Sequence, residues 1–203
     1  MTIKEKYQIK EVNVKTAQSM VIKNHYLHRK ASCSQAFGLF ENNELIGVVM
    51  YGTPPSSTLR ECCGKEHVND VIELSRLWIK DNTEKNVESY LVGNTLKKVN
   101  KPIIISYADS SEGHIGKIYQ ATNFIYTGLS KVGFYYKIPD NPNIHFNYTM
   151  LDKYPLKKIR KMYPNLQKVP RTRKHRYIYF NCSKMKKKHL LSKLRYKILP
   201  YPK

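Results

Sequence analysis

Residues 103–109 read Ile-Ile-Ile-Ser-Tyr-Ala-Asp, and this stretch decides the fold. The apolar run over residues 103–108 predicts a buried strand, because it is short and rich in β-branched side chains. Residues 71–79, Val-Ile-Glu-Leu-Ser-Arg-Leu-Trp-Ile, form a second long predicted strand, and residues 87–99 have the spacing of a helix. Another helix is predicted after residues 103–108. Asp109 is therefore expected at a carboxyl end of the sheet, where open α/β sheets bind their ligands.

Elsewhere in residues 1–140 the apolar spacing changes repeatedly between the repeat of strands and the repeat of helices. Asn42-Asn43 lies between two apolar runs and predicts a β-hairpin. The other predicted elements are a strand at 7–12, a helix at 15–24, hairpin strands at 36–40 and 45–51, a helix at 116–122, and strands near 124–127 and 132–138 that close the pattern.

Positive charge is concentrated at one end of the chain. The whole chain has 36 Lys and Arg against 15 Asp and Glu, a formal net charge of +21. Residues 151–203 hold 18 of these basic residues and a single acid, Asp152. Like charge at this density is self-repulsive unless a polyanion compensates it, so we expect a nucleic acid as partner.

The basic segment also contains ordered elements. Residues 176–180 alternate as a strand does, and leucines at 190, 191 and 194 predict a short helix with a basic outer face. A basic extension that only aids solubility and a membrane-surface helix are the alternatives. The expected DNA-binding residues are Arg171, Arg173, Lys174, His175, Arg176, Lys184, Lys186, Lys187 and Lys188.

The composition favours an intracellular protein without membrane contact. No apolar run approaches the roughly 20 residues that cross a bilayer, and no secretory signal is evident. Four cysteines without a C-x2-C pair predict neither a disulfide framework nor a structural zinc site.

The order of elements resembles that of the GNAT acyltransferases. That likeness implies an α/β (α+β) fold in which a central mixed sheet, flanked by helices, splays around the donor. We expect a GNAT-like catalytic body over residues 1–150. A basic, aromatic-containing C-terminal segment over residues 151–203 is expected to complete the sheet and bind DNA.

Four local stretches resemble the Mom family of phage DNA-modification proteins. They are residues 24–29 (Asn-His-Tyr-Leu-His-Arg), 73–78 (Glu-Leu-Ser-Arg-Leu-Trp), 107–109 (Tyr-Ala-Asp) and 116–124 (Gly-Lys-Ile-Tyr-Gln-Ala-Thr-Asn-Phe). The last of these stretches contains Tyr119. The resemblance covers about residues 15–182. It implies a phage or prophage enzyme in the host cytoplasm that converts adenine in DNA to N6-carbamoylmethyladenine and shields the DNA from restriction.

The resemblance also assigns functional residues, and the chemistry gives each a role. Asp109 is the expected proton acceptor for the weakly nucleophilic adenine amine. Tyr119 and Tyr26 are expected to hold or protonate a leaving group, and Arg76 to bind an anionic or carbonyl-bearing donor. The residues carried over by position are His25, Tyr26, Arg76, Ser89, Asp109 and Tyr119, of which Arg76 and Ser89 are expected to bind the donor.

Each residue has a purely structural alternative. Asp109 could cap a helix, Arg76 could serve a structural ion pair and Tyr119 could belong to the core. His25 could simply end the first helix. A further alternative is an iron site formed by the N and O atoms of His25, Tyr26 and Asp109.

The chemical identity of the donor stays open. Ordinary GNAT enzymes grip the pyrophosphate of acetyl-CoA with a glycine-containing loop before a helix, whereas residues 80–89 contain no glycine. The implied product carries a CH2 on the nitrogen, so acetyl-CoA and a glycine-derived small-molecule donor both remain.

Double-stranded DNA with a flipped adenine is the expected substrate, because a stacked, paired base is out of reach. Two rival functions remain. One is a conventional GNAT N-acetyltransferase acting on a protein or a small amine, and the other is a non-enzymatic nucleic-acid-binding protein.

Overall fold

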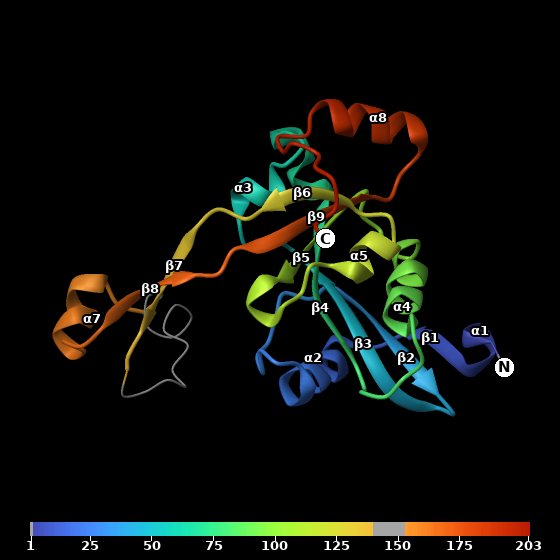
Figure 1. The fold of residues 1–203 in the computed structure, drawn as a ribbon, viewed down its shortest axis with the longest axis horizontal. Helices are drawn as coiled ribbons and strands as arrows, with labels where there is room; N and C mark the ends of the chain where they lie inside the picture. The colour runs from blue at the N-terminus through green and yellow to red at the C-terminus, as the bar shows by residue number, and fades with distance from the viewer. Residues whose placement is uncertain (1, 140–152) are drawn as a thin grey trace.

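The computed structural model describes residues 2–139 and 153–203, and it contains a seven-stranded sheet in the order β1-β2-β3-β4-β5-β9-β6 (Figure 1). The strands of this sheet are β1 (Tyr7–Glu11), β2 (Gln35–Glu41), β3 (Glu44–Gly52), β4 (Val71–Ile79), β5 (Ile103–Asp109), β6 (Ile125–Leu129) and β9 (Lys174–Phe180). A second, two-stranded sheet joins β7 (Gly133–Lys137) and β8 (Gln167–Arg171). The helices are α1 (Ile3–Lys6), α2 (Val14–Asn24), α3 (Ser57–Arg60), α4 (Val87–Leu96), α5 (Lys117–Ala121), α7 (Leu156–Met162) and α8 (Lys184–Ser192), with short 3-10 helices η1 (Lys65–Asp70) and η2 (Ser110–Glu112).

The main sheet is mixed and splayed, as the sequence predicts. Only β4 and β5 pair in parallel, from Val71–Ile103 to Leu74–Ser106. Both strands run on beyond the last pair, β4 to Ile79 and β5 to Asp109. Each then pairs only with its outer neighbour, β3 or β9, so the sheet opens between them.

Helices cover both faces of the sheet. The largest apolar cluster joins the sheet to α4 and α5 through Leu91 and Tyr119. On the opposite face, Leu59 of α3 and Leu190 of α8 pack over Val71 and Ile103. Because Val71 and Ile103 begin their strands, α8 lies near the amino ends of β4 and β5, away from the opening.

The predicted hairpin is confirmed. β2 and β3 pair in antiparallel fashion around Asn42 and Asn43, whose φ angles are +48° and +67°. Two consecutive left-handed residues make the turn that suits the twist of a hairpin, and asparagine tolerates this conformation better than most residues.

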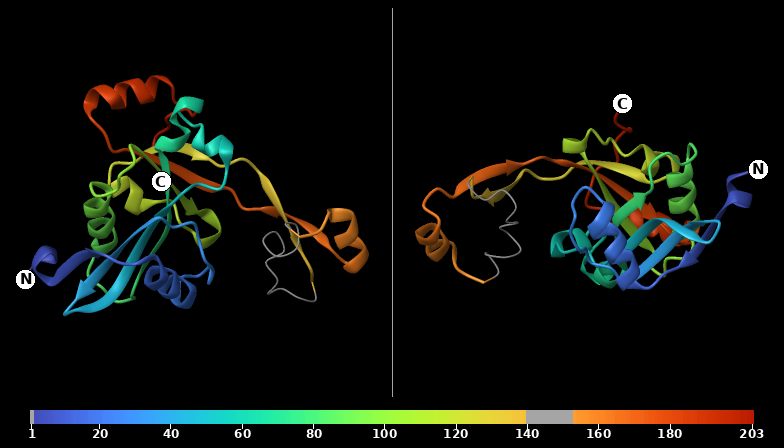
Figure 2. Two further views of the ribbon diagram at one scale, coloured as in Figure 1. Left: turned by 180° about the vertical axis from the view of Figure 1, so that it is seen from behind. Right: turned by 90° about the horizontal axis from the view of Figure 1, so that it is seen from below.

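The strand predicted near residues 132–138 is confirmed as β7, but it lies outside the main sheet. β7 pairs with β8 only, and this ribbon extends away from the body (Figures 1 and 2). β9 instead lies inside the main sheet between β5 and β6, because Tyr177 and Ile178 are buried on its two faces. None of the described helices is long and apolar enough to cross a bilayer.

Gly116 and Gly113 provide a test of how tightly α5 is seated. Gly116 has φ of +81°, and an added Cβ would collide with the ring of the buried Tyr177. Gly113 has φ of +69° with nothing within 4 Å of such a Cβ. Gly113→Ala should lower the free energy of unfolding by about 1–2 kcal/mol, the cost of a left-handed backbone at a residue with a Cβ. Gly116→Ala should lower it by about 1–3 kcal/mol more, because its Cβ also collides with Tyr177. Urea unfolding measures both, and equal losses would show that Tyr177 yields without cost.

Candidate active site

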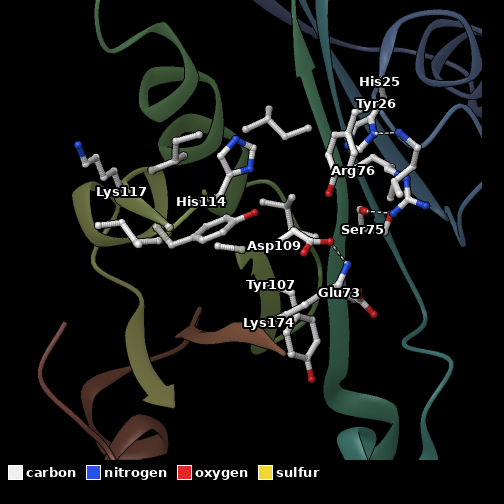
Figure 3. A pocket seen from close by; sticks show the side chains of 18 of the residues that line it. His25, Tyr26, Glu73, Ser75, Arg76, Tyr107, Asp109, His114, Lys117 and Lys174 are labelled. Atoms are coloured by element: carbon white, nitrogen blue, oxygen red, sulfur yellow. Dashed lines mark hydrogen bonds and ion pairs between the residues drawn. The ribbon is translucent and has the colours of Figure 1, made fainter. Parts of the chain in front are cut away.

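A cavity of about 480 Å³ opens where β4 and β5 separate (Figure 3). Its volume lies in the range of small-molecule sites. The loop after α2, the two separated strands, the loop before α5 and the start of β9 all contribute to its wall. The polar and aromatic residues that line it include His25, Tyr26, Glu73, Ser75, Arg76, Tyr107, Asp109, His114, Lys117, Tyr119 and Lys174.

Five of the six residues expected from the family resemblance meet in this cavity: His25, Tyr26, Arg76, Asp109 and Tyr119. The sixth, Ser89, lies outside it in the first turn of α4, where its hydroxyl donates to the Asn86 carbonyl at 2.9 Å.

Asp109 occupies the carboxyl end of β5 and is held from two sides. Its Oδ2 lies 2.6 Å from Nζ of Lys174, and its Oδ1 accepts from the hydroxyl of Ser111 at 2.7 Å. Oδ1 also caps η2 by accepting from the Ser111 backbone N–H at 3.2 Å, so the helix-cap interpretation is confirmed. Burial opposes ionisation, but the ion pair and the hydrogen bonds outweigh it and hold the pKa of Asp109 below its ordinary value. Asp109 is therefore a weak base.

Glu73 is a pocket carboxylate that the sequence analysis did not single out. It lies on β4 beside Lys174 (Figure 3), and its carboxylate forms no hydrogen bond or ion pair with any described residue. Burial raises its pKa to about 7, although the positive charges of Arg76 and Lys174 oppose the rise. A carboxylate between the buried Ile72 and Leu74 is the signal that could have identified it.

Lys174 and Arg176 correct the expected set of DNA-binding residues. Lys174 faces the cavity and pairs with Asp109. Arg176 is only 9% exposed, and its guanidinium donates to the hydroxyl and carbonyl of Thr127 at 2.9 and 2.8 Å. The same guanidinium stacks on the Tyr196 ring, 3.4 Å from its centre. Arg176 is therefore a structural residue, because no phosphate can reach it.

The other expected DNA-binding residues differ in their surroundings. Nδ1 of His175 lies 2.9 Å from the Tyr126 hydroxyl, which ties it to β6. Arg173 is exposed and donates to the Ser130 carbonyl at 2.7 Å. The remaining residues are exposed on β8 or on α8: Arg171, Lys184, Lys186, Lys187 and Lys188.

Aromatic rings line the cavity on the side of the α2 loop. The His25 ring stacks on Tyr26 with ring centres 4.3 Å apart, and Tyr26 meets His114 edge-on at 6.5 Å. Burial, followed by the charge of Arg76, lowers the pKa of His25 to about 4, so this ring is neutral at pH 7. Tyr26 is 43% exposed, which leaves it accessible to a substrate.

An iron site on His25, Tyr26 and Asp109 does not fit this geometry. Nδ1 of His25 accepts the Leu27 backbone N–H at 3.1 Å, so the neutral ring carries its proton on Nε2 and has no lone pair to offer. Asp109 is engaged by Lys174. Within residues 2–139 and 153–203, no three His, Cys, Asp or Glu side chains gather as metal ligands.

Tyr119 belongs both to the core and to the wall of the cavity. It packs against Phe124 and Tyr177 in the main core, and it also lines the cavity. Burial raises its pKa to about 12, although the Ser106 hydroxyl opposes the rise, so it remains a neutral phenol.

The loop between β4 and α4 turns without glycine. Asn82 and Asn86 take positive φ angles of +62° and +73°, the conformation that glycine commonly supplies. Asn86 directly precedes α4, and Ser89 lies in the first turn of that helix. The absence of glycine therefore does not prevent a tight turn into α4.

Comparisons with solved structures support the fold assignment. The structure resembles spermidine/spermine N-acetyltransferase SpeG from Vibrio cholerae, with a TM-score of 0.51, 8% identity, and coverage of 92% of this chain and 99% of that chain. It also resembles an IAA acetyltransferase from Bacillus cereus, with a TM-score of 0.50, 9% identity, and coverage of 86% and 99%. At these identities the likeness shows the GNAT fold alone.

Comparisons by sequence give the family. The chain is 28% identical to the protein named methylcarbamoylase mom of Escherichia phage Mu over 214 residues, which cover 97% of this chain and 86% of the relative. The model of the Mom protein family matches residues 6–203. Since the match spans nearly the whole chain, the protein belongs to the Mom protein family.

Proposed function

We propose that this protein is a phage- or prophage-encoded enzyme of the host cytoplasm that converts adenine in DNA to N6-carbamoylmethyladenine and so protects the DNA from restriction. The observation that carries the proposal is the cavity between β4 and β5, which brings the Glu73 carboxylate, a guanidinium and phenols together. Lys174 at its wall directly follows the segment of β7, α7 and β8, which we call the basic arm. The phage Mu relative, named a methylcarbamoylase, supports the same chemistry.

The reaction requires a proton acceptor, because the lone pair of the adenine amine is delocalised into the ring. As the new N–C bond forms, the bond to the leaving group of the donor breaks and a proton leaves the nitrogen. We assign the proton to Glu73, whose pKa of about 7 suits a general base at neutral pH. Asp109 is better suited to positioning, because it holds Lys174 and caps η2.

The donor is proposed to lie in the opening between β4 and β5. A solved Salmonella typhimurium yncA structure of the same fold contains its cofactor acetyl-CoA, with a TM-score of 0.50 and 10% identity. A CoA-type or glycine-derived donor would meet Arg76 at the cavity wall and Ser89 at the start of α4. The CH2 on the product nitrogen means that direct acetyl transfer is not the step.

The adenine is proposed to enter the cavity as a flipped base. Tyr26 is the half-exposed ring at the cavity wall and is suited to stack on the extruded base. Lysine and arginine side chains of the basic C-terminal segment would hold the phosphates. Arg171 and Arg173, which directly precede β9, are proposed to hold the phosphates nearest the cavity. The exposed lysines of α8, which lie near the amino ends of β4 and β5, are proposed to hold phosphates farther along the duplex.

Expression in a bacterium followed by digestion of total DNA to nucleosides tests the proposed function. Mass spectrometry should detect a deoxyadenosine heavier by one carbamoylmethyl group. An adenosine of unchanged mass together with acetyl-CoA turnover on amines would identify a conventional acetyltransferase instead. Unchanged mass without turnover would leave a DNA-binding protein.

Glu73→Gln tests the assignment of the base. Because Glu73 must be ionised to accept a proton, kcat of the wild-type enzyme should rise as the pH increases through about 7. Glu73→Gln should lower kcat by about 10²–10⁴-fold and abolish this rise. Nearby Asp109, Lys174, Arg76 and Tyr107 are unchanged in the variant, so the pH profile isolates Glu73. A variant that keeps the rise near pH 7 would contradict the assignment.

Asp109→Ala and a charge reversal on α8 separate chemistry from binding. Asp109→Ala frees Lys174 and uncaps η2, so it should abolish modification while duplex affinity stays close to that of the wild type. Lys184→Glu/Lys187→Glu should weaken duplex binding most at low salt, because exposed charges are screened. Binding is measured by fluorescence anisotropy. Normal modification by Asp109→Ala would show that Asp109 is dispensable.

A further inference from the structure

Strands β7 and β8 form an antiparallel ribbon that leaves the main sheet at the edge of the cavity. β6 ends at Leu129 just before the ribbon, and β9 begins at Lys174 just after it. Lys174 itself lines the cavity and pairs with Asp109. The ribbon then reaches away from the body in every view (Figures 1 and 2). A partner that binds the end of the ribbon nearest the main sheet is therefore held next to the cavity.

The strand register divides the ribbon side chains between two faces, because directly opposed residues of an antiparallel pair point to the same side. On one face Tyr136 packs with Ile138 and with Ile159 of α7 in a small separate core. On the other face, Gly133 opposes Arg171, Tyr135 opposes Val169, and Lys137 opposes Gln167. We call this second side the ribbon face, defined by Tyr135, Lys137, Val169 and Arg171.

The charge of the arm is of one sign. Every charged residue in 130–139 and 153–173 is basic and exposed, and none forms an ion pair with another described residue. These residues are Lys131, Lys137, Lys153, Lys157, Lys158, Arg160, Lys161, Lys168, Arg171 and Arg173. A polyanion is the partner that matches this surface.

We infer that the ribbon lies across the major groove of duplex DNA beside the target adenine, with the ribbon face toward the DNA. This inference rests on the proposed function, which makes DNA the substrate. The major groove of B-form DNA admits a two-stranded ribbon, whereas the major groove of an RNA duplex is too narrow.

The spacing of the two cations on the ribbon face matches the width of the major groove. Arg171 lies opposite Gly133, four residues along β7 from Lys137. Four strand residues span about 13 Å, close to the groove width of about 12 Å. The two cations can therefore reach the phosphates on both sides of the groove, while Tyr135 and Val169 between them meet the base edges.

Lys137→Glu/Arg171→Glu tests the inference, with Lys97→Glu/Lys98→Glu as a control of equal charge change. Lys97 and Lys98 are exposed just after α4, and that helix lies on the opposite side of the body from the ribbon (Figure 1). The ribbon variant should bind a fluorescent DNA duplex at least about tenfold more weakly, and the slope of log affinity against log salt should fall by about 2. Tyr135→Ala should weaken duplex binding without changing the slope, because it removes no charge.

Three results would overturn the inference: a ribbon variant that binds like the control, an unchanged salt slope, or equal affinity of the wild-type protein for an RNA duplex. Circular dichroism and thermal unfolding confirm that each variant is folded. The nucleoside product of the wild type is scored separately. If the ribbon variant binds DNA as the control does while the wild type still forms the product, only the ribbon inference is contradicted. If the ribbon variant binds more weakly but the wild type forms no product, only the proposed reaction is contradicted.

Discussion

The early end of the parallel ladder between β4 and β5 is the constraint on which the rest of the molecule depends. After Leu74 and Ser106 the two strands no longer exchange hydrogen bonds with each other. Beyond these residues the ladders to β3 on one side and to β9 on the other still hold the two strands in the sheet. This arrangement keeps the sheet stable while leaving a space at its centre, and the reactive side chains face that space.

β9 links the chemistry to the arm. It pairs with β5 along its whole length, and its first residue, Lys174, forms the ion pair with Asp109. The same strand continues from β8, so the basic arm and the cavity share one continuous segment of chain. Arg176 anchors this segment by binding Thr127 of β6 and stacking on Tyr196, which limits how far the strand can shift.

The sequence predicts local structure well, because apolar spacing is a local property. The long strand at 71–79, the central strand and the Asn42-Asn43 hairpin all agree with the structure. The partner of a strand is not local, so the sequence predicts the strand at residues 132–138 but not the sheet that it joins. Their alternation is that of a strand, but nothing in it shows that the partner is β8.

The candidate site likewise contains residues that the sequence predicts and residues that only the fold reveals. His25, Tyr26, Arg76, Asp109 and Tyr119 were reached through family resemblance, and the fold brings all five to one cavity. The pairing of Asp109 with Lys174 depends on the register of strands 65 positions apart in sequence, so the sequence alone groups Lys174 with the DNA-binding residues. The sequence alone does not reveal the role of Glu73, because burial, rather than residue type, gives it its unusual proton affinity.

The small core at the tip of the arm has an evolutionary consequence. Ile138 and Ile159 are buried there without help from the main sheet, so mutations in the arm exchange one local packing for another. Drift in this segment leaves the catalytic framework unstrained. The DNA contacts proposed for the arm can therefore change between related chains without disturbing the packing around the cavity.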